Sequence, residues 1–444
     1  MSAPVSSLRK VLKPVHLWAI AVGLVISGEY FGWNFGWSVA GTGGFLIATL
    51  LITVMYITFI FSFTELTTLV PHAGGPFAYA HRAFGNWGGF IAGYATLVEF
   101  LFTPPAIAFA LGSYTHFLYP TVSVLTAAFS CYVIFTAINL LGIKESATFS
   151  IIITILAVLE LLVFIGIAAP HFSYANFTAD ALPFGWSGVF AALPFAIWFY
   201  LAIEGVAMVA EETENPKRDI PKGYLYGLLT LVILALAVMM VTGGIGDWHL
   251  LSKIDYPLPE ALRMILGKDN PLTQLFASLG LFGLIASFHG TIITYSRQLF
   301  ALARSGYIPG FLAQINTRFQ TPHWALLTGG IIGCIALSTG TTDKLIILAV
   351  LGAIVMYIIS MLSLFALRVK EPLLIRPFRA PFYPYFPSIA LVLSIVCLVA
   401  IVYYNPLISL LFSVGFLLSA SVFYLVRKNS NQKEITLLHA TDAD

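Results

Sequence analysis

Charge is scarce in this 444-residue sequence: Asp, Glu, Lys and Arg make up 9% of it, against roughly 25% in an ordinary soluble domain. With 22 Lys and Arg against 20 Asp and Glu, the net charge is +2, and no basic surface is indicated that could hold nucleic acid. The three cysteines, Cys131, Cys334 and Cys397, lie in apolar stretches without metal or haem spacing. These scarcities exclude nucleic-acid binding, a disulfide scaffold and a cysteine metal centre.

Sequence signatures of catalysis are also missing. The chain has no HExxH or GxSxG motif and no phosphate-binding P-loop, so we expect no catalytic residue, metal, cofactor or ATP-driven step. The repeated pore segments and rings of charge that an ion channel would need do not occur either. An enzyme and a channel are therefore both disfavoured.

Apolar sequence is abundant, at 59% of the residues. Because a helix needs about 20 residues to cross the hydrocarbon core, runs of this length between polar or Pro/Gly breaks predict about twelve transmembrane helices. Continuous runs exclude a barrel, whose strands are short and alternate. The predicted spans are 16–40, 43–70, 87–118, 122–141, 147–169, 189–209, 224–244, 272–302, 324–338, 345–367, 389–404 and 407–426.

The basic residues predict the orientation of these spans. With the N-terminus inside, 18 of the 22 Lys and Arg fall on cytoplasmic segments, and the four outside are Lys253, Arg263, Lys268 and Lys344. Such an excess is typical of the cytoplasmic side. The first apolar stretch is longer than a signal-peptide core, so we interpret it as a retained span. The prediction is a multi-pass protein of the cell (inner) membrane, surrounded by the lipid bilayer, with both termini cytoplasmic.

Some acidic residues fall inside predicted spans, where a charge costs roughly 2.5–3.5 kcal/mol at the helix centre. They are Glu29, Glu65, Glu99, Glu160 and Glu204. Two adjoin glycines in segments typical of interrupted helices: residues 27–32 (SGEYFG) in span one and 203–205 (IEG) in span six. Interrupted helices at matching positions of two halves indicate the central site of a secondary transporter, because unwound backbone is tolerated only where it lines a cavity.

Three longer motifs resemble those of amino acid–polyamine–organocation (APC) permeases. The signature that begins in that family's second span is matched by residues 65–85, ELTTLVPHAGGPFAYAHRAFG. The motif after its sixth span is matched by residues 211–221, EETENPKRDIP, and the motif after its eighth span by residues 296–309, SRQLFALARSGYIP. The resemblance implies an all-α LeuT-like fold of about 12 transmembrane helices, with alternating access around a midplane site. It implies a cytoplasmic segment at 1–15, inverted five-helix repeats at 16–170 and 186–370, helices 11 and 12 at 385–427, and a cytoplasmic tail at 428–444.

The substrate class follows from a departure from the family pattern. Amino-acid members typically carry Gly-Ser/Thr-Gly at the first break, whose N–H groups hold the substrate carboxylate; here Ser27, Gly28 and Glu29 stand there. At low dielectric, Glu29 would repel a carboxylate and attract an ammonium by several kcal/mol. Residues 26–37, ISGEYFGWNFGW, are similar to the ethanolamine permease branch. We expect a transported small protonated amine without a carboxylate, ethanolamine foremost; an amino acid or polyamine permease or exchanger, or a transporter-derived amine sensor, stays open.

The predicted substrate site is divided between the two breaks. Aromatic rings crowd both, and a ring face can hold a cation at about 0.5–2 kcal/mol. Span six carries Ala202 where relatives commonly have Gly, so the extent of unwinding there stays open. The predicted substrate-binding residues are Ser27, Gly28, Glu29, Tyr30, Phe31, Trp198, Tyr200, Ile203 and Glu204.

The other acidic residues of interest are candidates for gating or coupling: Glu65, Glu99, Glu160, Glu211 and Glu212. Glu65, Glu211 and Glu212 lie in cytoplasmic-side motifs, which favours a structural or gating network. Proton-coupled relatives often carry Lys in the fifth span, where this chain has Ala157, with Glu160 one turn further on. We therefore expect electrogenic uniport or amine exchange, with proton coupling through Glu29, Glu99 or Glu160 as the alternative. The sequence indicates no oligomeric state.

Overall fold

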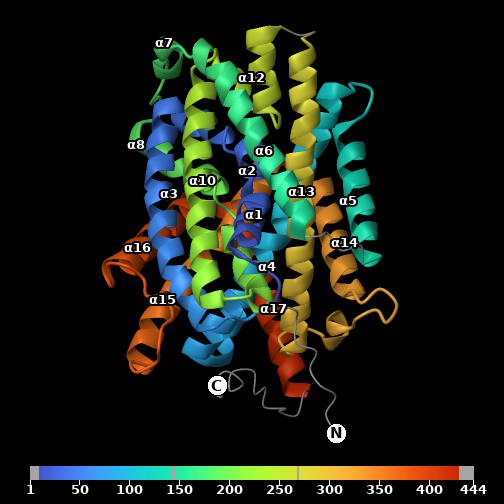
Figure 1. Cartoon of the computed structure of the whole chain (residues 1–444), viewed down its shortest axis with the longest axis vertical. Coiled ribbons are helices and arrows are strands. Elements are labelled where there is room, and N and C mark those ends of the chain that lie inside the picture. The colour runs from blue at the N-terminus through green and yellow to red at the C-terminus, as the bar shows by residue number, and fades with distance from the viewer. Residues whose placement is uncertain (1–9, 143–146, 268–269, 430–444) are drawn as a thin grey trace.

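The computed structural model describes residues 10–142, 147–267 and 270–429, so parts of the predicted segments 1–15 and 428–444 lie outside the described residues. Apart from an isolated bridge between Leu12 and Thr213, the regular structure of the described residues is helical. The long helices stand side by side along the long axis of the molecule (Figure 1). The chain is therefore an all-α bundle, as its continuous apolar runs predict.

The helices follow one another in chain order with short connections. The first half forms α1 (Pro14–Val25), α2 (Ser27–Tyr30), α3 (Phe35–Leu69), α4 (Pro76–Leu118), α5 (Val124–Leu140), α6 (Ala147–Ala168), η1 (Ala169–His171), α7 (Tyr174–Thr178) and α8 (Gly185–Ala191). The second half forms α9 (Leu193–Trp198), η2 (Ile203–Glu212), α10 (Pro216–Gly243), α11 (Trp248–Leu251), α12 (Pro257–Leu266), α13 (Pro271–Arg304), η3 (Gly310–Ala313), α14 (His323–Thr339), α15 (Thr342–Lys370), α16 (Tyr385–Tyr404) and α17 (Pro406–Asn429).

The transmembrane helices agree with the predicted spans. Among the described residues, nine helices are long and apolar enough to cross a membrane, and three shorter apolar helices, α1, α5 and α14, stand beside them. Each corresponds to one predicted apolar run. The sequence therefore predicted where each of these apolar helices lies, although several helices extend beyond the predicted bounds.

Two of the predicted breaks between spans are kinks inside longer helices. Gly41 (φ 71°) bends α3 between the predicted spans 16–40 and 43–70, and Gly85 (φ 70°) bends α4 just before the predicted span at 87. Glycine adopts this left-handed conformation at little cost because it has no Cβ. At Gly41, a Cβ would also lie 2.5 Å from the carbonyl oxygen of Asp180. Helical geometry therefore stops at each of these glycines, where two helices meet at a kink.

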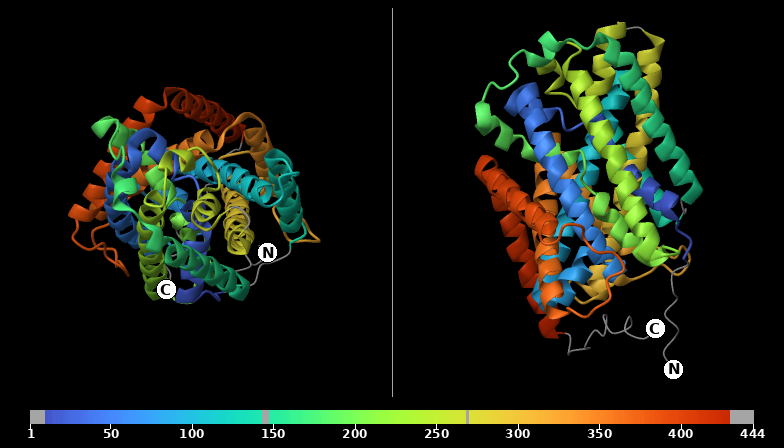
Figure 2. Two further views of the ribbon diagram at one scale, coloured as in Figure 1. Left: turned by 90° about the horizontal axis from the view of Figure 1, so that it is seen from above. Right: turned by 60° about the vertical axis from the view of Figure 1, so that its left-hand side comes forward.

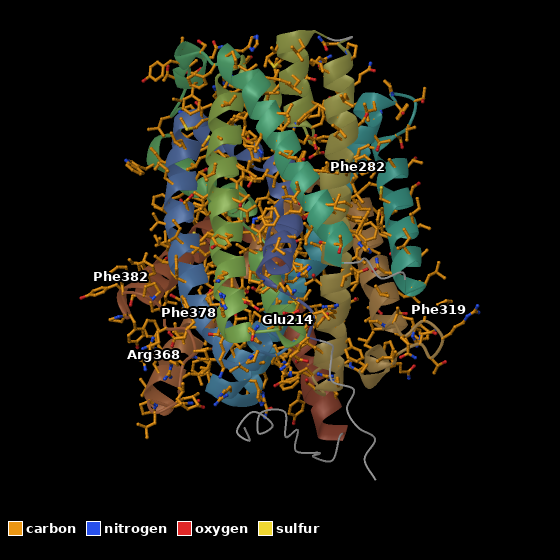
Figure 3. The ribbon with its side chains drawn as sticks, in the orientation of Figure 1. Glu214, Phe282, Phe319, Arg368, Phe378 and Phe382 are labelled. Atoms are coloured by element: carbon orange, nitrogen blue, oxygen red, sulfur yellow. The ribbon has the colours of Figure 1, made fainter. Side chains whose placement is uncertain are left out.

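The interrupted helices lie inside the bundle. All residues of α2 and α9 are buried, whereas 11% of the most apolar window of α17 is buried. Views from above and from the side place α16 and α17 at the outer edge (Figure 2). Large apolar side chains such as Phe282 on α13, which is 55% exposed, cover the outside (Figure 3). Apolar surface thus faces the surroundings while the polar interrupted segments are enclosed.

Candidate functional site

The first helical interruption lies slightly later than the sequence predicts. Ser27–Tyr30 keep one helical turn after α1, and the chain leaves the helix at Phe31 (φ −161°) and Gly32 (φ 91°). The Gly32 N–H is bonded 2.9 Å from Oδ1 of Asn34, which replaces a helical carbonyl. The predicted break at residues 27–32 is thus corrected to 31–34, because the Asn34 side chain stabilises the unwound turn.

The second interruption follows Trp198, at the end of α9. Ala202 adopts a left-handed conformation (φ 78°, ψ 4°), and the chain continues from Ile203 as the 3₁₀ helix η2. A left-handed residue with a Cβ costs roughly 1–2 kcal/mol, and a 3₁₀ helix of ten residues is unusually long. Alanine in place of glycine therefore does not prevent unwinding here, and the segment is held in a strained form by its surroundings.

The two interruptions pack directly on each other. A Cβ on Gly28 would lie 2.5 Å from the carbonyl oxygen of Trp198, so the two backbones are in close contact. The Trp198 indole N–H donates across the gap to the Phe31 carbonyl at 2.9 Å, and the two rings meet edge to face at 5.6 Å. Predicted substrate residues from distant parts of the sequence are therefore brought together, with Trp198 bracing the unwound turn.

Glu29 is a buried carboxylate at this junction without a partner. It is 0% exposed, and neither side-chain oxygen has a hydrogen-bond partner among the residues that the structure describes. The Tyr200 hydroxyl, which hydrogen-bonds Thr53 at 2.7 Å, lies within electrostatic range of it. A buried unpaired carboxylate is costly unless a positive charge or a proton joins it. Glu29 can thus bind a cationic group that enters the junction.

Two predicted substrate residues are engaged with neighbouring helices instead. The Tyr30 hydroxyl donates to Oε2 of Glu160 on α6 at 2.8 Å and approaches the Ala157 carbonyl at 3.3 Å. Ser27 Oγ lies 2.8 Å from Oγ of Ser287 on α13. These contacts fasten the α2 turn to α6 and α13. The Tyr30 hydroxyl therefore fills the neighbourhood of Ala157, where the family resemblance implies a lysine.

Glu99 on α4 and Glu204 on η2 form a second acidic centre. Both are 0% exposed, and their carboxyl groups lie against each other. The Tyr357 hydroxyl donates to Oε2 of Glu204 at 3.3 Å and lies 2.8 Å from the Tyr56 hydroxyl. Ile203 next to it is buried. Sequence reasoning missed Tyr357 and Tyr56, which are single tyrosines inside apolar runs.

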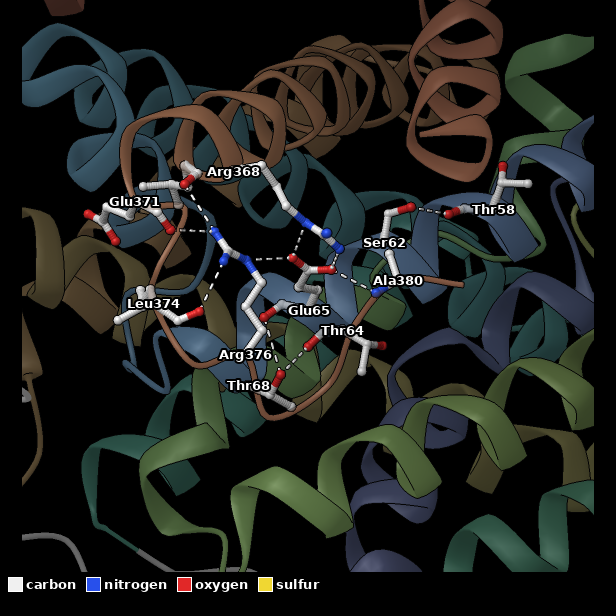
Figure 4. A network of polar contacts seen from close by, with 11 residues as sticks. Thr58, Ser62, Thr64, Glu65, Thr68, Arg368, Glu371, Leu374, Arg376 and Ala380 are labelled. Carbon is white, nitrogen blue, oxygen red and sulfur yellow. Dashed lines mark hydrogen bonds and ion pairs between the residues drawn. The ribbon is translucent and has the colours of Figure 1, made fainter. Parts of the chain in front are cut away.

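Glu65 lies in a fully paired network at the other end of α3 (Figure 4). Arg368 donates to both of its oxygens, at 2.8 and 2.6 Å, and Arg376 Nε lies 3.0 Å from Oε1. The Ala380 N–H donates to Oε2 at 2.7 Å. The network joins the ends of α3 and α15 to the loop that follows α15. Nothing in the sequence indicated that Arg376 would pair with Glu65, because Arg376 lies in a loop outside the motifs.

Glu211 and Glu212 connect the three sequence motifs at 65–85, 211–221 and 296–309. Glu211 accepts a hydrogen bond from the Ala73 N–H at 2.8 Å, and Glu212 pairs with Arg297 at 3.1 Å. The Glu212 carbonyl also accepts the N–H of Leu12 at 3.0 Å. The three motifs therefore meet in space and tie the segment before α1 to η2.

A surface groove lies elsewhere. It has a volume of about 510 Å³ and runs between α5 and α14, where Tyr132, Val133, Ile331 and Ile335 are among its lining residues. None of the predicted site residues lines it. The groove is therefore a feature of the outer surface and not part of the candidate site.

Comparison with known proteins identifies a family of membrane transporters. The family model described as "Amino acid permease" matches residues 12–436. The chain is 30% identical over 409 residues to an uncharacterized transporter of Rhizobium meliloti, covering 88% of this chain and 85% of the relative. It is 25% identical to the branched-chain amino acid permease BcaP of Bacillus subtilis, covering 96% and 94%, and 26% identical to the methylthioribose transporter of that organism, covering 86% and 87%.

Proposed function

The chain belongs to the amino acid permease family, and from that premise we propose that it is a secondary transporter for a small protonated amine without a carboxylate. Ethanolamine is the first candidate. The substrate binds between the interrupted segments around Phe31 and Ala202, and alternating access carries it across the membrane. Unwound backbone at such a junction is the usual site of substrate in transporters with interrupted helices.

The observation that carries this proposal is the unpaired Glu29. Its carboxylate is buried where the two interruptions touch, and it has no hydrogen-bond partner. An ammonium group would supply both the charge and the donors that Glu29 lacks. A substrate carboxylate in the same place would face like-charge repulsion at low dielectric. The site therefore favours amines over amino acids.

Transport of an amino acid is the second candidate. One relative is named a branched-chain amino acid permease and another a methylthioribose transporter, so membership of the family does not fix the substrate. An amino acid would bind with its ammonium at Glu29 and its carboxylate turned away. The two candidates differ in whether the carboxylate is tolerated.

Counterflow into proteoliposomes separates the candidates. The purified full chain is reconstituted with unlabelled ethanolamine inside, and uptake of labelled ethanolamine is compared with uptake of labelled serine, which differs by one carboxylate. We expect exchange of ethanolamine and none of serine, with protein-free liposomes as the control. Equal exchange of serine would contradict the amine assignment, and stabilisation of the protein by ligand in a thermal-shift screen gives an independent readout.

The arrangement in the membrane is part of the same proposal. Residues 16–170 and 186–370 form inverted five-helix repeats, each opening with an interrupted helix, and 385–427 add two helices at the periphery. The protein lies in the cell (inner) membrane with both termini cytoplasmic. The excess of Lys and Arg on the expected inner segments supports this orientation.

A further inference from the structure

The acidic pair of Glu99 and Glu204 has unpaired oxygens that the proposed substrate site does not use. Both side chains are fully buried and come from different elements, α4 and η2. Within the described part of the chain, neither oxygen of Glu99 has a hydrogen-bond partner, and neither does Oε1 of Glu204. Among the described residues, neither carboxyl forms an ion pair with a Lys or Arg, in contrast to Glu65, which pairs with Arg368 and Arg376.

Two ionised carboxylates in contact cannot satisfy each other, because each offers only acceptors. In a low-dielectric interior their repulsion is strong, and paired buried carboxyls therefore share a proton. We propose that Glu99 and Glu204 together form a proton-binding site that holds a single shared proton. With that proton, the O–H of one carboxyl donates to the other, and the pair carries one negative charge.

The surroundings place the proton on Glu99. Oε2 of Glu204 already accepts from Tyr357, which leaves Oε1 of Glu204 to accept from Glu99. The Glu99 carboxyl also lies near the backbone N–H of Ala202. Glu99 is therefore the donor and Glu204 the acceptor in the protonated pair.

The other titratable groups facing the pair are neutral at physiological pH. They are the hydroxyls of Tyr357 on α15, Tyr56 on α3 and Tyr224 on α10, with the Cys397 thiol of α16 lying beyond Tyr56. None brings a positive charge that could replace the proton. Because these neighbouring groups supply no positive charge, a proton has to neutralise one of the two carboxylates.

Proton binding is linked to the shape of the interruption between α9 and η2. Glu204 follows the left-handed Ala202 by two residues, and Ala202 also faces Glu99. Loss of the proton breaks the O–H bond of Glu99, leaves two carboxylates in contact and pushes η2 away from α4. The bound proton itself does not depend on the proposed substrate; its coupling to amine movement rests on the proposed function.

Infrared difference spectroscopy of the purified full chain in lipid nanodiscs tests the site without measuring transport. Protonated carboxyls give a carbonyl band that carboxylates lack. We expect Glu99→Gln to remove this band, and Glu204→Gln to shift it, because Glu99 then keeps its proton but donates to an amide oxygen. The double variant should lose no more than Glu99→Gln alone. Glu160→Gln is the control, because it can remove only its own contribution. Unchanged bands in both single variants, or additive losses in the double variant, would overturn the shared proton.

A further variant covers the case in which Glu99→Gln does not fold. Tyr357→Phe removes the hydroxyl that donates to Glu204, so the band should shift in frequency without disappearing. An unmoved band would place the protonated carboxyl elsewhere and refute the pair.

Transport measurements then test coupling. In proteoliposomes at zero potential, a proton gradient should drive amine accumulation above that of protein-free liposomes by the unaltered chain, and Glu99→Gln should abolish this drive while retaining counterflow. Retained proton drive in Glu99→Gln would contradict coupling through the pair. Counterflow of serine would instead contradict the substrate class, so the two failures are distinguishable.

Discussion

At the scale of single residues, buried glutamates in this protein differ in how completely they are satisfied. Glu65 is enclosed by two arginines and a backbone N–H, whereas the Glu29 carboxylate has no hydrogen-bond partner among the described residues. A buried charge with hydrogen-bond and ion-pair partners joins structural elements, whereas a buried charge without partners is available to bind a ligand. This contrast separates a structural network from a binding site more clearly than burial does, since both residues are 0% exposed.

Neutralising Glu29 should weaken amine binding. Glu29→Gln keeps the size of the side chain but removes its charge, so we expect the affinity for ethanolamine to fall tenfold or more, about 1.4 kcal/mol. Isothermal titration of the purified protein measures this change. Glu212→Gln, at a partly exposed ion pair, is the matched control and should bind normally. Unchanged affinity in Glu29→Gln would remove Glu29 from the substrate site.

Neutralising Glu65 should damage stability and slow transport while sparing affinity. Glu65→Gln leaves Arg376, which is 9% exposed, without its counter-charge, and breaking a buried ion pair costs about 3–5 kcal/mol. The melting temperature should therefore fall well below that of Glu212→Gln, whose partner Arg297 is 41% exposed and whose pair is worth about 0–1 kcal/mol. Equal melting temperatures for the two variants would argue against the network's structural role.

Asp255, in the loop between α11 and α12, should make the stability of the protein depend on pH. Burial raises the pKa of Asp255 to about 6, and its Oδ1 has no partner. The folded state therefore holds this proton more tightly than the unfolded chain, whose pKa is about 4. The free energy of unfolding should fall as pH rises from about 4 to 6, by at most about 3 kcal/mol.

Melting curves of Asp255→Asn across this pH range check the assignment. The variant cannot titrate, so that part of the slope should vanish and stability above pH 6 should rise. Asp247→Asn is the control, because Asp247 is exposed and its hydrogen bond from His249 lowers its pKa. An unchanged slope in Asp255→Asn would assign the dependence to another group.

At the scale of elements, the interruptions depend on close backbone contact. Gly28 allows α2 to touch the Trp198 carbonyl, where a Cβ would come within 2.5 Å. Asn34 extends the same junction outward, because its side chain donates to the carbonyls of Leu251 and Ile254 at 2.7 and 2.8 Å. Movement at the first interruption would therefore be transmitted to the loop that contains α11 and α12.

Gly28→Ala should separate the two interruptions. The added methyl group would clash with the Trp198 backbone, which cannot move aside as a flexible side chain can. We therefore expect a lower melting temperature and at least a tenfold loss of transport. Gly166→Ala on α6 is the matched control, because nothing lies within 4 Å of its Cβ position. Full transport in Gly28→Ala would show that the close contact is dispensable.

At the scale of the whole molecule, orientation can be tested with added cysteines. Helix α12, which Lys253 precedes, and Phe319, which Arg318 precedes, lie at opposite ends of the bundle (Figures 1 and 3). In a chain whose three cysteines are replaced by serine, Lys253→Cys should react with an impermeant maleimide on intact cells. Arg318→Cys should react only after permeabilisation. The reverse pattern would invert the proposed topology.

The sequence by itself determined the membrane class, the position of all the spans and the family, because these depend on the length and order of apolar runs and on contiguous motifs. It also located the two interruptions to within a turn, from glycines beside buried acids. The sequence did not predict which side chains contact one another. Whether Glu65 meets Arg376, or Tyr30 meets Glu160, depends on contacts between residues far apart in the chain.

Only the tertiary structure decided which acids are satisfied and which are free. It turned the Tyr30 hydroxyl toward α6, unwound Ala202 despite its Cβ, and set Glu99 against Glu204. In the sequence, these residues simply interrupt apolar stretches, and nothing there distinguishes the role of one from that of another. Packing makes them different, because burial raises the energetic cost of any polar atom without a partner, and partners are fixed only when distant helices meet.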